Sequence, residues 1–381
     1  MSPRVYLDHH ASAPLGDEAR AAMIEAMGAV SGNPSSLHRE GRRARDLLER
    51  ARADVARAIG AREREVVFTS GGTEAVHLGV RGMGEGSEVS RVLCDPGAHP
   101  CLRAACEALA RRRGVALDWI RCGAGGPDYA GEYPLDGALV AIAWVQHETG
   151  RVAEGAEGLI ARATARGAKV VVDAVQALGK VPLDVRALGA TAVALSAHKI
   201  GGPQGIGALW VAPGERVAPR VTGGGQERGL RAGTENLLGA AGFGAAARCV
   251  PARLAAMPAV AARRARIERA LLDLGADATC EGPRVATVSH VAVRGCDGAE
   301  LVAGFDLEGV AVSSTAACSS GRSEPSESLR RLFPEAPWRA SSALRVSLGP
   351  STTDGDVARF VEVASAVIAR MRGAHSSTKR T

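Results

Sequence analysis

Short apolar runs alternate with helical stretches through the first 250 residues, and this alternation constrains the fold more than any other feature of the sequence. The runs are continuously apolar, which is typical of strands in a sheet covered by helices on both faces. Strands alternating with helices also favour parallel pairing. The sequence therefore predicts an α/β fold with a mainly parallel sheet. Its strands are expected at residues 66–69, 91–94, 139–145, 169–172, 192–195 and 208–211.

Helical patterns are expected at 37–59, 100–113 and 155–166, and the pattern changes after about residue 250. A long helix rich in alanine and arginine comes first, then strands near 286–293, 310–313 and 344–347 and a final helix at 354–372. A chain of 381 residues is also long for one ordinary core. We predict a large domain at residues 15–250, a smaller α+β domain at 1–14 and 251–373 that carries the loop around Cys318, and a frayed tail at 374–381.

Composition excludes several classes of protein. No apolar run reaches the ~18–20 residues that a membrane span needs, and the N-terminus carries Asp8 and two histidines where a signal peptide would be apolar. We therefore expect a cytoplasmic protein. The net charge of +6 could suit nucleic acid, but the arginines are interleaved with Glu and Asp, so no direct nucleic-acid partner is expected. The eight cysteines form no CxxC pair, and no metal site is predicted.

The chain contains 43 arginines but only four lysines, at positions 169, 180, 199 and 379. Arginine does not release its proton near neutral pH and so cannot serve as an imine-forming amine, whereas lysine can. Lys199 follows an expected strand and precedes a glycine-rich turn, and ligands of open α/β sheets bind at such strand ends. Spacing alone favours neither a reactive amine nor a surface lysine at this position.

The neighbours of Lys199 favour the reactive amine. Asp173 ends an apolar strand, where its carboxylate could keep a pyridinium nitrogen protonated. Gly72 and Thr73 lie between a strand and a helix, whose first turn offers free N–H groups to a phosphate. Ser196 and His198 flank the lysine. These are the parts that a pyridoxal phosphate (PLP) site requires.

The sequence resembles the group I cysteine desulfurases, which are class V PLP enzymes of fold type I. The resemblance covers nearly the whole chain, in family order. It is carried by YLDHHASAP, SGNPSSLHREG, VVFTSGGTEA, the His99 region, VQHETG, VDAVQALGK, SAHKIGGPQGIGAL, GGGQERGLRAGTEN, VSSTAACSSGRSEPS and SSALRVSLG.

The resemblance implies a role for each site residue. Lys199 would hold PLP covalently, Asp173 would pair with the ring nitrogen, Gln176 would hydrogen-bond the ring hydroxyl and His99 would stack on the ring and assist catalysis. Cys318 would accept the sulfur as a persulfide. The remaining roles are phosphate binding by Gly72, Thr73, Ser196 and His198, phosphate binding in the neighbouring subunit by Thr234, substrate binding by Arg345 and Asn33, and cofactor contact by His147.

Some positions depart from the family pattern. Gln146-His147-Glu148 stands where Asn-Asn-Glu is common, and His77 replaces another common asparagine. Ser12 and Ala13 stand where the family usually has a pair of threonines. These departures bear on the rate, the substrate and the sulfur acceptor.

The resemblance implies an enzyme that converts L-cysteine to L-alanine and works as a homodimer. The sulfur would pass to an acceptor such as an iron–sulfur scaffold protein or a tRNA-thiolation enzyme. One alternative is another PLP activity on this fold, such as a selenocysteine lyase or an aminotransferase. Cys318 argues against transamination, which needs no thiol. A second alternative is a weakly catalytic assembly partner. The presence of both Lys199 and Asp173 argues against this alternative.

Overall fold

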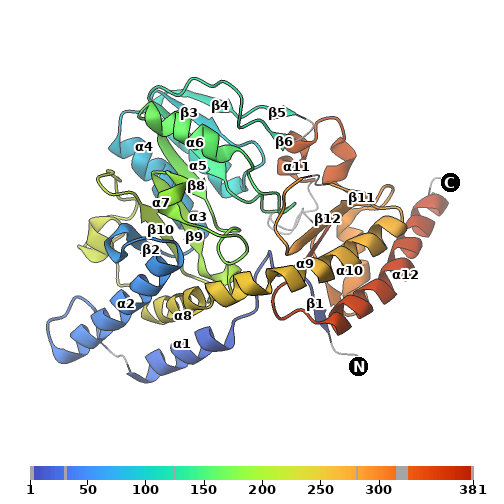
Figure 1. The fold of residues 1–381 in the computed structure, drawn as a ribbon, viewed down its shortest axis with the longest axis horizontal. Helices are drawn as coiled ribbons and strands as arrows, with labels where there is room; N and C mark the ends of the chain where they lie inside the picture. The colour runs from blue at the N-terminus through green and yellow to red at the C-terminus, as the bar shows by residue number, and fades with distance from the viewer. Residues whose placement is uncertain (1–3, 30–31, 124–125, 280–281, 315–324, 379–381) are drawn as a thin grey trace.

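The computed structural model describes residues 4–29, 32–123, 126–279, 282–314 and 325–378. Its main sheet has seven strands in the order β2-β10-β9-β8-β7-β3-β4 (Figure 1). These strands are β2 (Val66–Thr69), β3 (Arg91–Cys94), β4 (Ala116–Trp119), β7 (Ala138–Ala143), β8 (Lys169–Asp173), β9 (Ala192–Ser196) and β10 (Gly207–Val211).

The predicted α/β architecture is confirmed, and the sheet is mainly parallel. Strands β9, β8, β7, β3 and β4 pair in parallel, whereas β10 runs antiparallel to both of its neighbours, β9 and β2. Strand β4 was not predicted, because this edge strand is only partly buried and has no continuous apolar run. Strands β7 and β9 are buried at every position, as their apolar sequences indicated.

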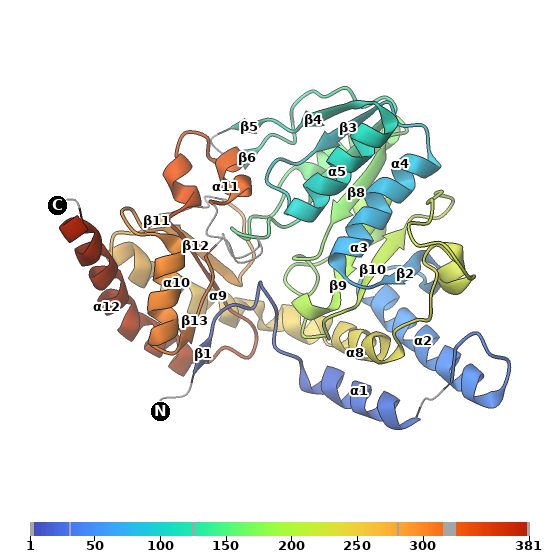
Figure 2. The ribbon, with the colours of Figure 1, turned by 180° about the vertical axis from the view of Figure 1, so that it is seen from behind.

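Helices cover both faces of the sheet (Figures 1 and 2). Alternate residues of one strand face different clusters, since Val140 and Ile142 belong to one and Leu139 and Ala141 to the other. The first cluster includes residues of α2, α6, α7 and α8, and the second includes residues of α3 and α5. The helices here are α1 (Asp17–Ala29), α2 (Arg39–Ala58), α3 (Gly72–His77), α4 (Met83–Gly86), α5 (Pro100–Arg113), α6 (Ala156–Ala165), α7 (Val185–Leu188) and α8 (Leu237–Arg248).

A separate apolar cluster joins the start of the chain to its last third. Val5 and Leu7 pack there with residues from Met257 onward. Its sheets are β11 (Asp277–Ala278), β12 (Val288–Ala292) and β14 (Ala343–Ser347), which are antiparallel, and the parallel pair β1 (Val5–Tyr6) and β13 (Val310–Ala311). The helices are α9 (Val250–Asp273), α10 (Gly298–Leu307), α11 (Glu327–Leu332) and α12 (Asp354–Thr378). A short antiparallel pair, β5 (Cys122–Gly123) and β6 (Gly126–Pro127), completes the strands described.

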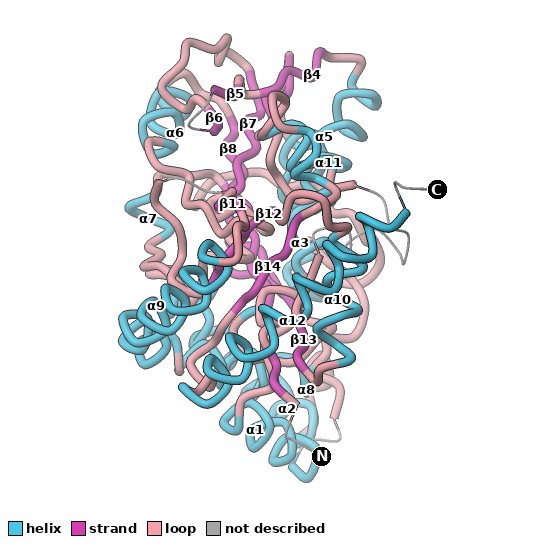
Figure 3. Tube along the Cα trace, turned by 90° about the vertical axis from the view of Figure 1, so that its right-hand side faces the viewer, coloured by secondary structure: helices cyan, strands magenta, loops and turns pink. Residues whose placement is uncertain are grey.

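Helix α9 links the main sheet to this separate cluster (Figure 1). Val250, at the start of α9, packs in the first cluster of the main sheet, and Ile267 packs in the cluster that contains Val5 and Leu7. Seen from the side, α10 and α12 lie next to each other over β13 and β14 (Figure 3). The domain division predicted from the sequence stays a prediction. The final helix is longer than expected, since α12 ends at Thr378 rather than at Arg372. No proline follows Gly373 to end the helix.

No helix in the described ranges combines the length and the apolar character that crossing a bilayer requires.

We predict that Phe305→Ala lowers the free energy of unfolding by about 3–5 kcal/mol, because it empties a fully buried site. The Phe305 ring stacks on Phe360 with ring centroids 5.1 Å apart. Leu307 lies on the same helix but is 84% exposed, so Leu307→Ala should change stability by less than about 0.5 kcal/mol. Guanidinium denaturation of both variants checks this, and equal losses would contradict the packing described.

Candidate active site

A cavity of about 200 Å³ lies at the carboxyl ends of β7, β8 and β9. The last residue of each strand lines it: Ala143, Asp173 and Ser196. This is where an open α/β sheet binds its ligands. Nine predicted site residues line this cavity, namely Gly72, Thr73, His99, His147, Asp173, Gln176, Ser196, His198 and Lys199.

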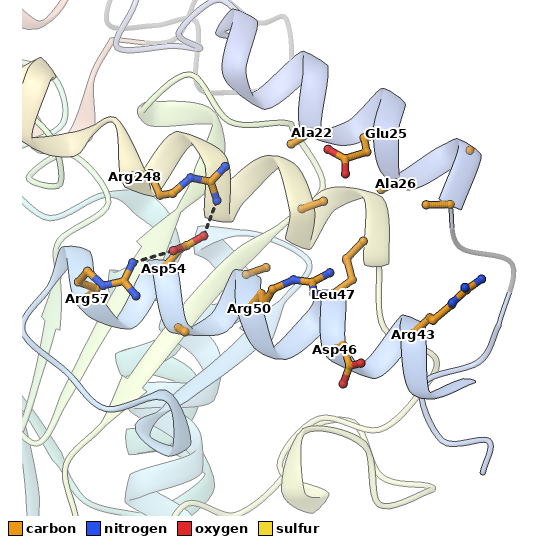
Figure 4. A pocket seen from close by; sticks show the side chains of 15 residues that line it. Ala22, Glu25, Ala26, Arg43, Asp46, Leu47, Arg50, Asp54, Arg57 and Arg248 are labelled. Atoms are coloured by element: carbon orange, nitrogen blue, oxygen red, sulfur yellow. Dashed lines mark hydrogen bonds and ion pairs between the residues drawn. The ribbon is translucent and has the colours of Figure 1, made fainter. Parts of the chain in front are cut away.

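A larger hollow of about 870 Å³ lies between α1, α2 and α8, but it lacks this convergence of buried polar groups (Figure 4). Its central carboxylate, Asp54, already forms ion pairs with Arg57, at 2.8 Å, and with Arg248. Volume alone therefore does not identify the site, whereas a cluster of buried titratable groups at strand ends does.

Lys199 ends a 3₁₀ turn, η3 (Ala197–Lys199), which directly follows β9. Its Nζ donates hydrogen bonds to the carbonyl oxygens of His10, at 2.7 Å, and Ala11, at 2.9 Å. The N-terminal segment is tied back to this turn, because the Ala13 N–H donates to the carbonyl of His198. The amine is thus held at the cavity wall by backbone acceptors.

Asp173 is a buried carboxylate that forms no ion pair within the described ranges. Its Oδ1 accepts a hydrogen bond from the Val175 N–H at 3.0 Å. Burial raises the pKa of Asp173, since the charged form is poorly solvated there. A ligand that brings a protonated nitrogen would supply a cation for this carboxylate, which has no ion-pair partner in the described part of the chain.

His99 is the N-cap of α5, and its Nδ1 accepts a hydrogen bond from the Cys101 N–H at 3.2 Å. The other ring nitrogen, Nε2, therefore carries the proton of the neutral imidazole. Burial lowers the pKa of His99 to about 3, so the ring is uncharged at neutral pH. A neutral ring at the cavity wall suits stacking on a flat ligand.

Cys101 lines the cavity, although its position carried no sequence signal that we recognised. Its Sγ lies 3.0 Å from Nδ1 of His99. Burial raises the pKa of the Cys101 thiol to about 12, and the negative charge of Asp173 acts in the same direction. The thiol is therefore protonated at neutral pH and is a poor nucleophile.

His147 meets the His99 ring edge-on, with ring centroids 4.8 Å apart. Its Nε2 lies 3.4 Å from Oε1 of Glu148, and its Nδ1 lies 3.4 Å from Nε2 of Gln146. Neither Gln146 nor Glu148 lines the cavity, and Nε2 of His147 has no hydrogen-bond partner within the described ranges. His147 thus contributes an imidazole ring to the cavity wall at a position where the family commonly has an asparagine.

A second group of residues that line the cavity suits a phosphate. A Cβ on Gly72 would lie 2.8 Å from Cγ2 of Val175, so only glycine lets the first turn of α3 approach this closely. The Ser196 Oγ is buried and has no hydrogen-bond partner within the described ranges. Nδ1 of His198 lies 3.3 Å from the Ser12 Oγ. Together with Asp173, which lines the same cavity, these groups fit PLP.

Other predicted residues lie outside this cavity. Arg345, in β14, is buried; its Nη2 donates to Asp8 at 2.9 Å, its Nη1 donates to the His147 carbonyl at 3.1 Å, and its Nε has no partner within the described ranges. Asn33 is exposed and caps a turn by accepting the Ser35 N–H. Thr234 is exposed in a small hollow of about 100 Å³.

Cys318 lies outside the described residues, and its role stays a prediction. His77, the other departure from the family pattern, lies on α3 and does not line the cavity. No group of three or more His, Cys, Asp or Glu side chains in the part of the chain described is arranged to hold a metal ion.

Comparison with known families agrees with this geometry. The family model for aminotransferase class-V matches residues 5–360. The chain belongs to this family. It is 38% identical over 379 residues to a cysteine desulfurase of Cereibacter sphaeroides, covering 97% of each chain.

Solved structures are similar as well. A NifS-like protein superimposes with a TM-score of 0.88 at 26% identity, covering 96% of this chain and 99% of that one. SspA in complex with cysteine superimposes with a TM-score of 0.77 at 26% identity, covering 92% of this chain and 100% of that one.

We predict that the cofactor-free protein loses stability as the pH falls from 7 to 5. Burial lowers the pKa of His9, His198 and His290 to about 4, and that of His99 to about 3, from an ordinary value of 6.5. Below pH 6.5 the unfolded chain binds protons that the folded chain does not, so the free energy of unfolding falls with pH.

Urea denaturation at pH 7.5, 6.5, 5.5 and 5.0 tests this dependence. The exposed His38 offers a matched control, and His38→Asn should leave the slope against pH unchanged. Equal unfolding midpoints at pH 7.5 and 5.0 would show that these imidazoles are protonated in the folded protein.

Proposed function

We propose that this protein is a PLP-dependent cysteine desulfurase that converts L-cysteine to L-alanine and transfers the sulfur to Cys318. One observation carries the proposal: the Lys199 amine and the buried carboxylate of Asp173 line one cavity at the strand ends of a class V fold. Curated relatives over the full length are named cysteine desulfurases, and a similar structure is described in complex with cysteine.

The cavity residues divide the work of holding PLP. The Lys199 amine would bind it covalently, and Asp173 would pair with its ring nitrogen. His99 would stack on the ring, and Gln176 would hydrogen-bond its hydroxyl. When bound, PLP supplies a ring that takes up the electrons released at Cα of the amino acid. The phosphate would be met by Gly72, Thr73, Ser196 and His198.

Substrate handling falls to residues around the cavity. The guanidinium of Arg345 has the fork geometry that suits a carboxylate, and Asn33 is a further candidate for substrate contact. Once displaced, the Lys199 amine would take the proton from Cα. The thiolate of Cys318 would then attack the substrate sulfur. An S–S bond forms, the Cβ–S bond breaks, and its electron pair is protonated at carbon.

The overall reaction is balanced without a further oxidant or reductant. L-cysteine and the Cys318 thiol give L-alanine and a Cys318 persulfide. The terminal sulfur must then pass to a thiol acceptor. We propose a protein acceptor of the iron–sulfur scaffold or tRNA-thiolation type, in the cytoplasm, with no direct nucleic-acid partner.

A homodimer would complete the site. Thr234 is exposed and shares its hollow with Ser70 and Arg231, away from the cavity of its own chain. This placement supports a role for Thr234 at the cofactor phosphate of a second subunit.

Lys199→Ala should abolish both covalent cofactor binding and alanine formation, because no other amine replaces it in the cavity. The visible absorption of the purified protein, followed by borohydride reduction and peptide mass spectrometry, checks the attachment site. Lys169 pairs with Glu215 at 2.7 Å, so Lys169→Ala is the matched control and should behave as wild type. A yellow, active Lys199→Ala protein would refute the assignment.

Cys318→Ala should still bind PLP and L-cysteine, because Lys199, Asp173 and Arg345 are intact, yet form little alanine. After incubation with cysteine, mass spectrometry of the wild-type protein should find one added sulfur, about 32 Da, on the Cys318 peptide. The buried Cys101 thiol, with a pKa of about 12, should stay unmodified. Sulfur on Cys101 with none on Cys318 would contradict the mechanism.

A further inference from the structure

Lys180 is a buried amine beside the cavity to which the preceding sections assign no role. It is 6% exposed and follows β8 by a short turn. Its Nζ donates to Oε1 of Gln176 at 3.0 Å and approaches the carbonyl oxygen of Lys199 at 3.5 Å. Lys180 therefore touches two residues of the site without lining the cavity itself.

No carboxylate in the part of the chain described forms an ion pair with Lys180. Burial lowers its pKa well below the ordinary value, and nearby positive charges, first Lys199 and then Arg253 and Arg345, add to this effect. The amine is therefore more readily deprotonated than an exposed lysine. The titratable and charged groups around it are Lys199, Arg253, Arg345, His9 and His10.

The amide of Gln176 has its orientation fixed from two sides. Its Nε2 donates to the carbonyl oxygen of His10 at 2.9 Å, and a carbonyl oxygen can only accept. The amide oxygen must then face Lys180, whose Nζ donates to it. One N–H of Gln176 has no partner within the described ranges, and Gln176 lines the cavity.

We propose that Lys180 is a positioning residue that locks the Gln176 amide with its N–H group directed to the ligand. The inference rests on the proposed function, since the ligand oxygen concerned is the ring hydroxyl of PLP. A donor at this place favours the deprotonated form of that oxygen. If the Gln176 amide were flipped, its oxygen would be directed to the ligand in place of the N–H group. An acceptor would then also meet the carbonyl oxygen of His10, which can only accept.

The first test does not depend on PLP. With only four lysines, ¹⁵N- and ¹³C-labelled lysine gives four side-chain resonances, which Lys169→Met, Lys199→Ala and Lys379→Met assign by elimination. In the folded protein, with or without cofactor, Gln176→Met should shift the Lys180 side-chain resonance, because it removes the acceptor that lies 3.0 Å from Nζ of Lys180. An unchanged Lys180 resonance would overturn the proposal and leave the proposed function untouched.

The second test is a double-mutant cycle read from the absorption of the bound cofactor as a function of pH, without cysteine. Lys180→Met should raise the midpoint of this titration by about half to one pH unit, the worth of one neutral hydrogen bond. In a Gln176→Met background the same change should add less than about 0.2 unit, because Lys180 acts through Gln176.

Lys169→Met, on the surface, is the matched control and should leave the midpoint unchanged. A wild-type midpoint in Lys180→Met, or a full shift that persists in the Gln176→Met background, would show that Lys180 is merely structural. A wild-type protein that binds no PLP would instead refute the proposed function, and the lysine resonances would still report the contact between Lys180 and Gln176.

Discussion

The carbonyl oxygen of His10 is the acceptor on which the geometry of the site depends. It receives hydrogen bonds from the Lys199 amine, at 2.7 Å, and from the Gln176 amide, at 2.9 Å. His10 is itself fixed to the other part of the molecule, because its N–H donates to the Ser347 Oγ and its Nε2 lies 2.8 Å from the Thr287 Oγ1. The reactive amine on the main sheet is thus oriented by a segment anchored in the second core.

Buried carboxylates differ in their partners between the cavity and the rest of the protein. Arg52 and Glu227 form a buried, bidentate ion pair at 2.6 and 2.8 Å, and Glu227 also accepts the Phe68 N–H. That pair holds Glu227 and Arg228 in a left-handed backbone conformation, with φ of 47° and 58°, which non-glycine residues rarely adopt. Asp173, by contrast, keeps a buried carboxylate without an ion pair in the described ranges, at a cost that a cationic ligand group would offset.

The sequence predicted six of the seven strands of the main sheet and most of the cavity, because continuous apolar runs and strand-end polar residues are local patterns. Lysine rarity pointed to Lys199, but the same argument applied to Lys180 and Lys169. Lys169 makes an ion pair with Glu215, so rarity alone does not separate a site residue from a partly exposed one.

The remaining features are not local in sequence. The acceptor of Lys199 is a backbone carbonyl, which carries no residue signature, and it lies 189 positions away along the chain. The Arg345 guanidinium donates a hydrogen bond to Asp8, which lies 337 positions away along the chain. Such contacts follow from the packing of the two cores and from strand register, neither of which a single sequence specifies.

The histidine at position 147 has a physical explanation that the sequence did not provide. Glu148 is buried, and its carboxylate accepts a hydrogen bond from the Ser326 Oγ at 2.8 Å, with the His147 imidazole 3.4 Å away. The presence of His147 lowers the pKa of Glu148 and also acts to lower that of Asp173. The imidazole also meets the His99 ring edge-on, which is a ring contact that an asparagine could not make. The departure from the family pattern therefore changes the packing of the cavity wall beside His99.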